Sequence, residues 1–300
     1  MKQKNKDAVG SLLILLAGVL WGSMGLFVRS LSGRGFDSLQ ITAGRLSFAA
    51  LFFWMILLFR PKEERAIRLR DLPLFLGLGL ASILFFTVCY FSAIAILPLS
   101  TAAILLYTSP IWVTLLSALL FHERLTAAKL IALCMAFGGC VLVSGLGGGR
   151  LTFRGLLLGL GAGLGYGLYS ILGSIALRRY SPYTVTAWTF LIAGIGALCI
   201  CRPAEMLSLV GDSASPVGTV LFFLLTAFVT AVIPFLSYTL GLRSVEAGKA
   251  AILATVEPMV ASLLGVLVFR EALTLSAVLG ILLILGAVLL LSLPGRKGSV

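Results

Sequence analysis

Residues 102–126 read AAILLYTSPIWVTLLSALLFHERLT, and residues 250–274 read AAILATVEPMVASLLGVLVFREALT. The two segments are identical at 12 of 25 positions when they are aligned at a fixed offset of 148 residues. Each is mainly apolar, carries one proline, Pro110 or Pro258, and has Phe-x-Glu close to its end. Self-similarity at a fixed offset indicates an internal duplication of a structural unit.

The composition of the chain is typical of a membrane protein. Hydrophobic residues make up 60% of the chain, charged residues make up 11%, and the mean hydropathy is +1.11. An average soluble domain has about 25% charged residues. The sequence therefore predicts an all-α membrane protein, because a bilayer is crossed by helices of about 20 apolar residues.

Ten apolar runs have this length, and the connections between them are short and rich in Gly, Pro, Ser and Arg. These connections leave no stretch long enough for a soluble domain. The predicted spans are Ala8–Val28, Ser38–Phe59, Leu72–Leu97, Ser100–Phe121, Thr126–Gly145, Phe153–Leu177, Tyr183–Cys201, Val217–Leu240, Ala247–Phe269 and Thr274–Leu293.

The duplication predicts two five-helix repeats, residues 8–145 and 153–293. Because five is odd, the second repeat enters the membrane inverted relative to the first. With the N-terminus inside, the inner segments hold 16 Lys and Arg residues and the outer segments hold 6. This asymmetry predicts that both termini are cytoplasmic. The expected fold is ten transmembrane helices in a 5+5 arrangement. The expected location is the cell membrane, as a multi-pass protein of a bacterial plasma membrane.

The net charge of +12 does not indicate a nucleic-acid partner, because the basic residues are spread over many loops. His122 is the single histidine, and the five cysteines lie in or at the ends of spans without a Cys-x-x-Cys pair. No metal site, cofactor or catalytic residue is predicted. The stretch 241–250 resembles a phosphate loop but has Arg243 where its first glycine belongs, so an enzyme is not expected.

At the level of these motifs the chain resembles the EamA-type ten-helix transporters of the drug/metabolite transporter superfamily. The resemblance rests on SPIWVTLLSALLFHERLT and EPMVASLLGVLVFREALT, each followed by a glycine-containing helix, with Gly138 and Gly139 in one and Gly280 and Gly286 in the other. It covers both halves. It implies alternating access around a central cavity, and it does not specify the substrate.

Two ionisable residues lie deep within predicted spans, Glu257 in the ninth and Arg45 in the second. A charged group near the centre of a span costs at least about 2.5–3.5 kcal/mol, so such residues usually face a cavity or a partner. Glu257 is predicted to contact substrate or to couple transport to protons. A structural role stays open for both residues, since Arg45 can also extend its charged end toward the membrane surface.

The ninth span is predicted to present a face of small residues around this carboxyl group. Ala250, Ala254, Ala261 and Gly265 share the helical face of Glu257. Pro258 removes the N–H that would bond the carbonyl of Ala254, and Pro110 does the same in the fourth span. Both prolines are predicted to loosen their helices near the membrane centre, although kinks that serve packing alone would give the same pattern.

Aromatic and polar side chains supply the rest of the predicted substrate site. Trp21 and Tyr166 occupy equivalent positions of AGVLWG at 17–22 and AGLGYG at 162–167. Aromatic walls with a few polar groups suit a small organic solute, whereas packing between helices is the alternative role for any single ring. The predicted substrate-binding residues are Trp21, Tyr90, Tyr107, Tyr166, Tyr169, Ser170, Tyr238, Thr255 and Glu257.

The sequence as a whole favours a secondary transporter for a small organic metabolite, possible classes being amino acids, other metabolites and drug-like solutes. A passive channel and a scaffold or flippase-like membrane protein stay open as alternatives. The expected partners are a small-molecule substrate and the lipid bilayer, and the expected assembly is a monomer or weak homodimer. The substrate, the direction of transport and the coupling ion are not specified by any motif.

Overall fold

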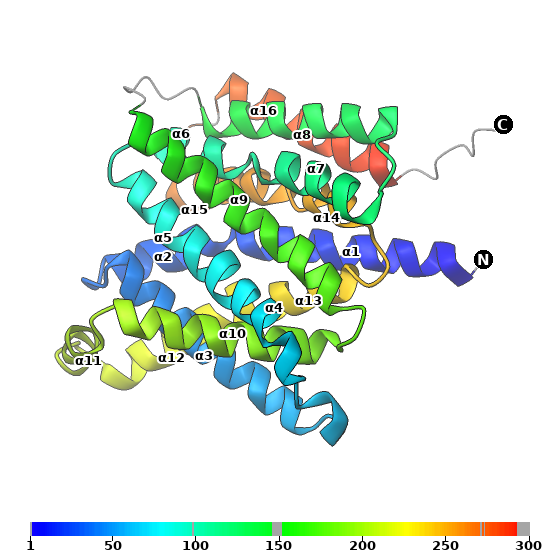
Figure 1. Cartoon of the computed structure of the whole chain (residues 1–300). Coiled ribbons are helices and arrows are strands. Elements are labelled where there is room, and N and C mark those ends of the chain that lie inside the picture. Colours follow the sequence, from blue (N-terminus) through cyan, green and yellow to red (C-terminus); the bar gives the residue numbers. More distant parts are fainter. Residues whose placement is uncertain (1, 98, 146–151, 271, 273, 293–300) are drawn as a thin grey trace.

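The computed structural model describes residues 2–97, 99–145, 152–270, 272 and 274–292, and within them the regular structure is helical throughout (Figure 1). Two π-helical turns, η3 (Gly77–Leu84) and η4 (Phe228–Val232), and two 3-10 turns, η1 (Lys62–Glu64) and η2 (Leu69–Asp71), supplement the α-helices. The α-helices are α1 (Lys2–Gly22), α2 (Met24–Ser32), α3 (Ser38–Leu58), α4 (Leu72–Leu76), α5 (Phe85–Ile94), α6 (Leu99–Leu106), α7 (Ser109–Phe121), α8 (Ala127–Ser144), α9 (Phe153–Ala176), α10 (Pro182–Ile200), α11 (Pro203–Gly211), α12 (Pro216–Ala227), α13 (Ile233–Gly241), α14 (Ala247–Leu253), α15 (Val256–Phe269) and α16 (Leu275–Ser292).

The helices have the length and composition of membrane spans. In the described part of the chain, nine helical stretches are long and apolar enough to cross a bilayer, from Asn5–Ser32 to Ala247–Val268. The last apolar helix, Leu275–Leu291, is shorter. Leucines such as Leu12 and Leu119 are widely exposed on the bundle surface, as expected for lipid-facing positions. The chain is a multi-pass membrane protein, and the exact number of ten crossings stays a prediction.

The two ends of the bundle are easily distinguished. Helix α1 begins and α16 ends at the same end, on the right of Figure 1, whereas α11 lies at the opposite end. We call the first the inner end, after the predicted cytoplasmic orientation, and the second the outer end.

Two predicted spans differ from the observed helices. The first span continues beyond Val28 to Ser32 as α2, after an interruption at Ser23, whose hydroxyl donates a hydrogen bond to the carbonyl of Leu20 at 2.6 Å. Such a side-chain bond competes with the helical ladder. The third span ends at Ile94, not at Leu97, a few residues before a proline that cannot continue a helix.

The fourth span of each half is broken near its proline. Helices α6 and α7 are separated at Tyr107 and Thr108, and α14 and α15 are separated at Ala254 and Thr255. At each break a threonine hydroxyl donates to a carbonyl three residues earlier at 2.6 Å, Thr108 to Leu105 and Thr255 to Ile252. Each break lies a few residues before the proline of its span, at the position where the sequence predicts a loosened helix.

Two details of the sequence prediction for the ninth span are wrong. The face that links Ala250 and Ala254 to Ala261 is not continuous, because the break separates α14 from α15. The carbonyl of Ala254 is also not free: it accepts the backbone N–H of Glu257 at 3.1 Å. The tighter turn at the break brings this N–H to the carbonyl and replaces the donor that Pro258 lacks.

The halves share further backbone details. The π turn η4 corresponds, at the 148-residue offset, to residues 80–84 of η3. His122 and Arg270, which follow α7 and α15, are both left-handed, each with φ near 55°. These are uncommon conformations for residues other than glycine, so their recurrence shows that the duplication extends to local geometry.

The halves also interlock through glycines. A Cβ on Gly18 of α1 would lie 3.0 Å from the carbonyl oxygen of Ala254, at the break between α14 and α15. A Cβ on Gly163 of α9 would lie 2.7 Å from the carbonyl oxygen of Leu105, close to the break between α6 and α7. The first helix of each half therefore packs closely on the broken helix of the other half, and only glycine permits this approach.

Candidate functional site

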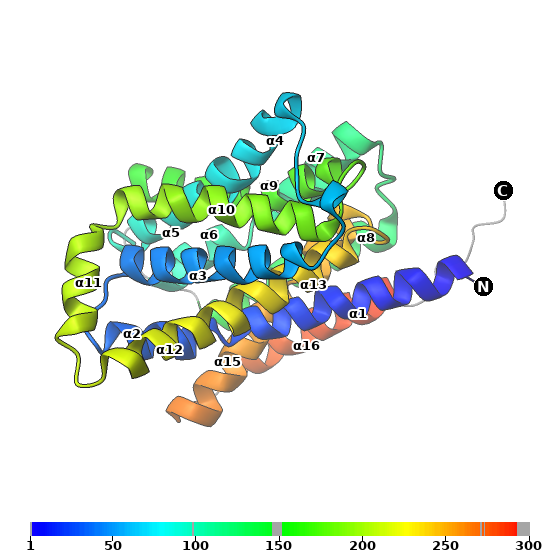
Figure 2. The ribbon, with the colours of Figure 1, turned by 90° about the horizontal axis from the view of Figure 1, so that it is seen from below.

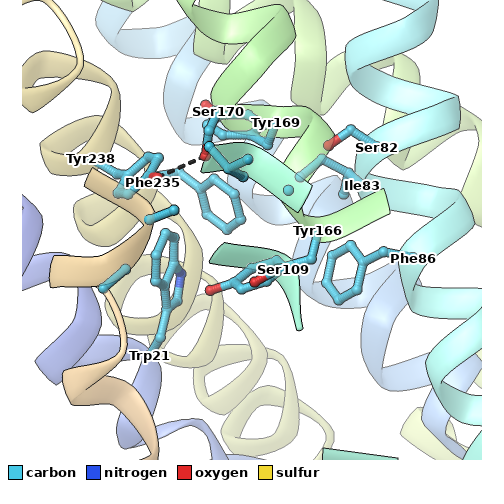
Figure 3. A pocket seen from close by; sticks show the side chains of 14 residues that line it. Trp21, Ser82, Ile83, Phe86, Ser109, Tyr166, Tyr169, Ser170, Phe235 and Tyr238 are labelled. Carbon is cyan, nitrogen blue, oxygen red and sulfur yellow. Dashed lines mark hydrogen bonds between the residues drawn. The ribbon is translucent and has the colours of Figure 1, made fainter. Parts of the chain in front are cut away.

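A small pocket lies between the two halves, beside the broken helices (Figure 3). Its first-half walls come from α1, η3, α5 and α7, and its second-half walls come from α9, α13 and α14. The lining residues are Trp21, Ser82, Ile83, Phe86, Ser109, Val113, Tyr166, Gly167, Tyr169, Ser170, Phe235, Tyr238, Ala251 and Ala254.

Trp21 of the first half packs among aromatic rings of the second half. Its side chain is 5% exposed. Its ring centroid lies 4.9 Å from that of Phe235, 5.4 Å from that of Tyr238 and 6.1 Å from that of Tyr166. These distances are typical of favourable aromatic pairs. The indole therefore forms one wall of the pocket and also part of the contact between the halves.

Two hydroxyl pairs fix α9 against α13. Ser170 and Tyr238 share a hydrogen bond of 2.7 Å, and Tyr169 and Thr239 share another of 2.7 Å. All four residues are buried. Buried hydroxyls require such partners, and the hydroxyls of Tyr169 and Tyr238 on this wall are already engaged in hydrogen bonds.

The Tyr166 hydroxyl instead donates to a carboxylate: its oxygen lies 2.9 Å from Oε2 of Glu257 on α15. Glu257 is half-buried and stands just beyond the break between α14 and α15, outside the set of pocket-lining residues. Tyr166 therefore connects the pocket to the charged residue that sequence analysis singled out. At the 148-residue offset, the first half has Ser109 in place of Glu257.

Arg45 on α3 is the second charge near this site. Its side chain is buried, at 5% exposure, and its Nη1 donates to Sδ of Met24 at 3.1 Å and to the carbonyl of Thr230 at 3.5 Å. The guanidinium interacts electrostatically with Glu257, but the two described side chains do not approach within ion-pair distance. Glu257 and Arg45 therefore lie near each other without forming a direct ion pair.

The pocket is too small for an organic solute in this conformation. Its volume is about 20 Å³, enough for roughly one water molecule. Sites for small organic ligands typically have about 300–1,000 Å³. Binding of such a ligand would require the walls to separate.

Five of the predicted substrate-binding residues meet at this pocket: Trp21, Tyr166, Tyr169, Ser170 and Tyr238. Three others lie outside it in this conformation. Tyr90 packs beside Phe91, Tyr107 packs against the main core, and Thr255 is buried at the helix break. Pro110 and Pro258 lie at the starts of α7 and α15, where they accompany the two breaks.

The other nine lining residues were not among the predicted substrate-binding residues, and they include the polar or aromatic side chains of Ser82, Phe86, Ser109 and Phe235. Ser82 is fully buried, and its hydroxyl has no hydrogen-bond partner. Ser109 had a signal, because it is the repeat counterpart of Glu257. Among the described residues there is no cluster of His, Cys, Asp and Glu suited to hold a metal ion.

Comparison with known proteins agrees with this architecture. The sequence profile of the EamA-like transporter family matches residues 8–145 and 153–293, one match for each half. An "Uncharacterized transporter" of Archaeoglobus fulgidus is 33% identical over 282 residues, which cover 94% of this chain and 95% of the relative. The "Uncharacterized transporter YwfM" of Bacillus subtilis is 28% identical over 297 residues, covering 97% and 96%.

Two further matches concern the membrane and the fold. The "Uncharacterized inner membrane transporter YicL" of Salmonella typhimurium is 26% identical over 294 residues and covers 96% of each chain. A crystal structure with a TM-score of 0.75 and 22% sequence identity covers 94% of this chain and 95% of the other, and it shows that the fold is shared. With both halves matched by one family profile, and with a relative of 33% identity along nearly its whole length, the chain belongs to the EamA-like transporter family.

Proposed function

We propose that this protein is a secondary transporter that moves a small organic solute by alternating access between two inverted five-helix halves. The predicted ten spans and cytoplasmic termini belong to this proposal. Its support is the position of the pocket at the junction of the halves, beside two helix breaks related by the repeat. Discontinuous helices at a repeat interface are typical of substrate sites in such transporters.

The observation that carries the proposal is the hydrogen bond between Tyr166 and Glu257. It connects an ionisable group within the membrane to the aromatic wall of the pocket, with the positive charge of Arg45 nearby. A carboxyl group within the bilayer is costly and usually has a functional partner. Glu257 can exchange a proton during transport, or it can stay charged and contact an amine-bearing solute.

The first experiment identifies a ligand. Purified protein in detergent is heated with single members of a panel of amino acids, amines, nucleobases and sugars, and the unfolding temperature is recorded. A compound that binds the folded state raises this temperature by mass action. Hits are then tested for flux into proteoliposomes, with and without an imposed pH gradient.

Glu257→Gln tests the role of the carboxyl group, because glutamine preserves size and hydrogen bonding but cannot titrate or carry charge. We expect folded protein with lost or pH-insensitive transport of the hit compound. Glu63→Gln is the matched control, since Glu63 is an exposed carboxylate outside the site. If Glu257→Gln transports the compound at the wild-type rate and with the wild-type pH dependence, both proposed roles are contradicted. If the flux through the wild-type protein does not saturate as the solute concentration rises, the carrier mechanism is contradicted.

A further inference from the structure

A buried ionic cluster joins the two halves at the inner end of the bundle. Lys129, in the first turn of α8, contacts Oε2 of Glu123 and lies 3.2 Å from Oε2 of Glu246. The Lys129 and Glu123 side chains are only 5% and 8% exposed, whereas that of Glu246 is 61% exposed. Burial of the pair carries a desolvation penalty for both charges. Removing one partner is strongly destabilising, because it leaves the other charge buried without compensation.

The local sequence directs these charges into the protein. After α7 the left-handed residue His122 reverses the chain, so that Glu123 turns back and accepts the hydroxyl of Ser117 at 3.0 Å. Thr126 then caps α8 by accepting the backbone N–H of Lys129 at 3.2 Å. The cap sets where α8 begins and therefore where Lys129 lies, opposite Glu123.

The cluster crosses from the first half to the second. Oε1 of Glu123 accepts the backbone N–H of Ala247, the first residue of α14, at 3.0 Å. The approach is very close, since a Cβ on Gly248 would lie 2.8 Å from Cε of Lys129 and 3.1 Å from Oε2 of Glu123. Glu123 and Lys129 therefore hold the start of α14 through one backbone bond and one ion pair with Glu246.

Helix α14 separates this cluster from the pocket. Ala251 and Ala254 line the pocket, while Ala247 and Ala251 pack with Val113 of α7 and Ile171 of α9 in a buried apolar cluster. A path from the pocket to the inner end must therefore displace α14 from α7. That displacement would pull the first residues of α14 away from Glu123 and Lys129.

The outer end is not built in the same way. At the 148-residue offset, Ala277 replaces Lys129 and Pro98 replaces Glu246, while Glu271 matches Glu123 in sequence but lies outside the described residues. The described parts of α6 and α15, which are the repeat counterparts of α14 and α7, do not pack along each other as α14 and α7 do. In Figure 2 the outer end of α15 projects away from the bundle, at the lower edge of the view.

We propose that Glu123, Lys129 and Glu246 form an ionic latch that holds the inner side of the transport path closed. The latch rests on the proposed function, because it presupposes that the halves separate at the inner end during transport. Since the repeat-related outer positions lack the lysine and the second glutamate, the latch biases the resting protein toward the state that is closed inside. Each transport cycle must release α14 from it.

Accessibility of Ala251 tests the latch without a substrate. The native cysteines are replaced, Ala251→Cys is introduced, and inside-out membrane vesicles are treated with an impermeant thiol reagent. Ala251 is 8% exposed and lies on the pocket side of α14, so labelling should be slow while the latch is intact. Lys129→Met, which keeps the apolar stem and removes the charge, should accelerate labelling by at least about tenfold, as expected when a buried pair loses one partner.

Glu246→Gln provides a second variant, because this exposed side chain can be changed without threatening folding. It removes the ion pair with the second half and should accelerate labelling by about two- to fivefold, the effect of an exposed pair. Glu63→Gln, an exposed carboxylate at the same end, is the control and should leave the rate unchanged. Size-exclusion profiles establish which variants are folded.

Unchanged labelling in folded Lys129→Met or, if that variant does not fold, in Glu246→Gln would overturn the latch. Equal acceleration by Glu63→Gln would overturn it as well. Because labelling needs no solute, this outcome is independent of the flux experiments: a protein that transports nothing in proteoliposomes can still show latch-dependent labelling, and a functional transporter can lack it.

Discussion

The glycines of α9 allow a quantitative test of how the halves fit together. A Cβ on Gly163 would lie 2.5 Å from Oγ1 of Thr108 and 2.7 Å from the carbonyl oxygen of Leu105. Those two atoms are hydrogen-bonded to each other at the break between α6 and α7. Two residues earlier on the same helix, a Cβ on Gly161 would meet nothing closer than Sγ of Cys89, at 3.5 Å.

The two alanine substitutions should therefore have different effects on the free energy of unfolding. In a helix, Gly→Ala gains about 0.5–1 kcal/mol of stability. At position 163 this gain is opposed by an overpacking cost of about 1–3 kcal/mol, because the neighbouring carbonyl is backbone and cannot rotate away. We expect Gly161→Ala to raise the free energy of unfolding and Gly163→Ala to lower it or leave it near the wild-type value, with a difference of about 1–3 kcal/mol between the variants.

Equilibrium unfolding of the purified variants in mixed detergent micelles, followed by circular dichroism, measures this difference. Because the substitutions share one helix and one chemical change, effects on detergent binding and expression are matched. Equal stability of Gly161→Ala and Gly163→Ala would refute the argument that α9 packs against the break of the fourth span through its glycines. A loss of transport in folded Gly163→Ala alone would further indicate that this contact moves during the cycle.

Other expectations can be tested in the same preparations. Trp21→Ala should weaken binding of an identified ligand more than Trp21→Phe does, because the ring supplies most of the contact; equal loss of folded protein without a binding effect would indicate packing alone. Gly280→Ala should destabilise the contact between α8 and α16 by about 1–3 kcal/mol, since its Cβ would lie 2.6 Å from the carbonyl oxygen of Gly139, whereas Gly138→Ala, whose Cβ would have no neighbour closer than 4.0 Å, should not. Single cysteines at Gln3 and Gly298, the latter outside the described residues, should resist an impermeant reagent in intact cells, and strong labelling of either would contradict cytoplasmic termini.

The features visible in the sequence are those that repeat or that carry a local physical constraint. Pro110 and Pro258 recur at one offset and each lacks a backbone donor, so the breaks beside them were predictable. Glu257 was identifiable because a carboxyl group within an apolar span is costly. Its partner Tyr166 is 91 residues away, and only the folded bundle brings the two together.

The features that escaped prediction depend on helix register or on tertiary packing. Ser82 enters the pocket from a π turn, and such a turn requires no distinctive residue, so the sequence gives no sign that the helical register shifts there. Phe235 resembles any other phenylalanine of an apolar span. The latch was missed for another reason: Glu123 and Lys129 lie at the ends of predicted spans, where charged residues are ordinarily solvated, and their burial arises from contact with α14.

The two halves share several backbone features but differ in some of their charged residues. Both halves keep the broken fourth span, the π turn and the left-handed residue after the fourth span. The charges do not follow this symmetry, since Glu257 replaces Ser109 in the pocket region and Lys129 has no counterpart at position 277. Two states of a symmetric scaffold would be nearly equal in free energy. A charge that has no counterpart in the other half shifts that equilibrium, because its interactions differ between the two states. In the proposed mechanism, the residues shared by the two halves would permit alternation, and the residues that differ between them would set which state is favoured.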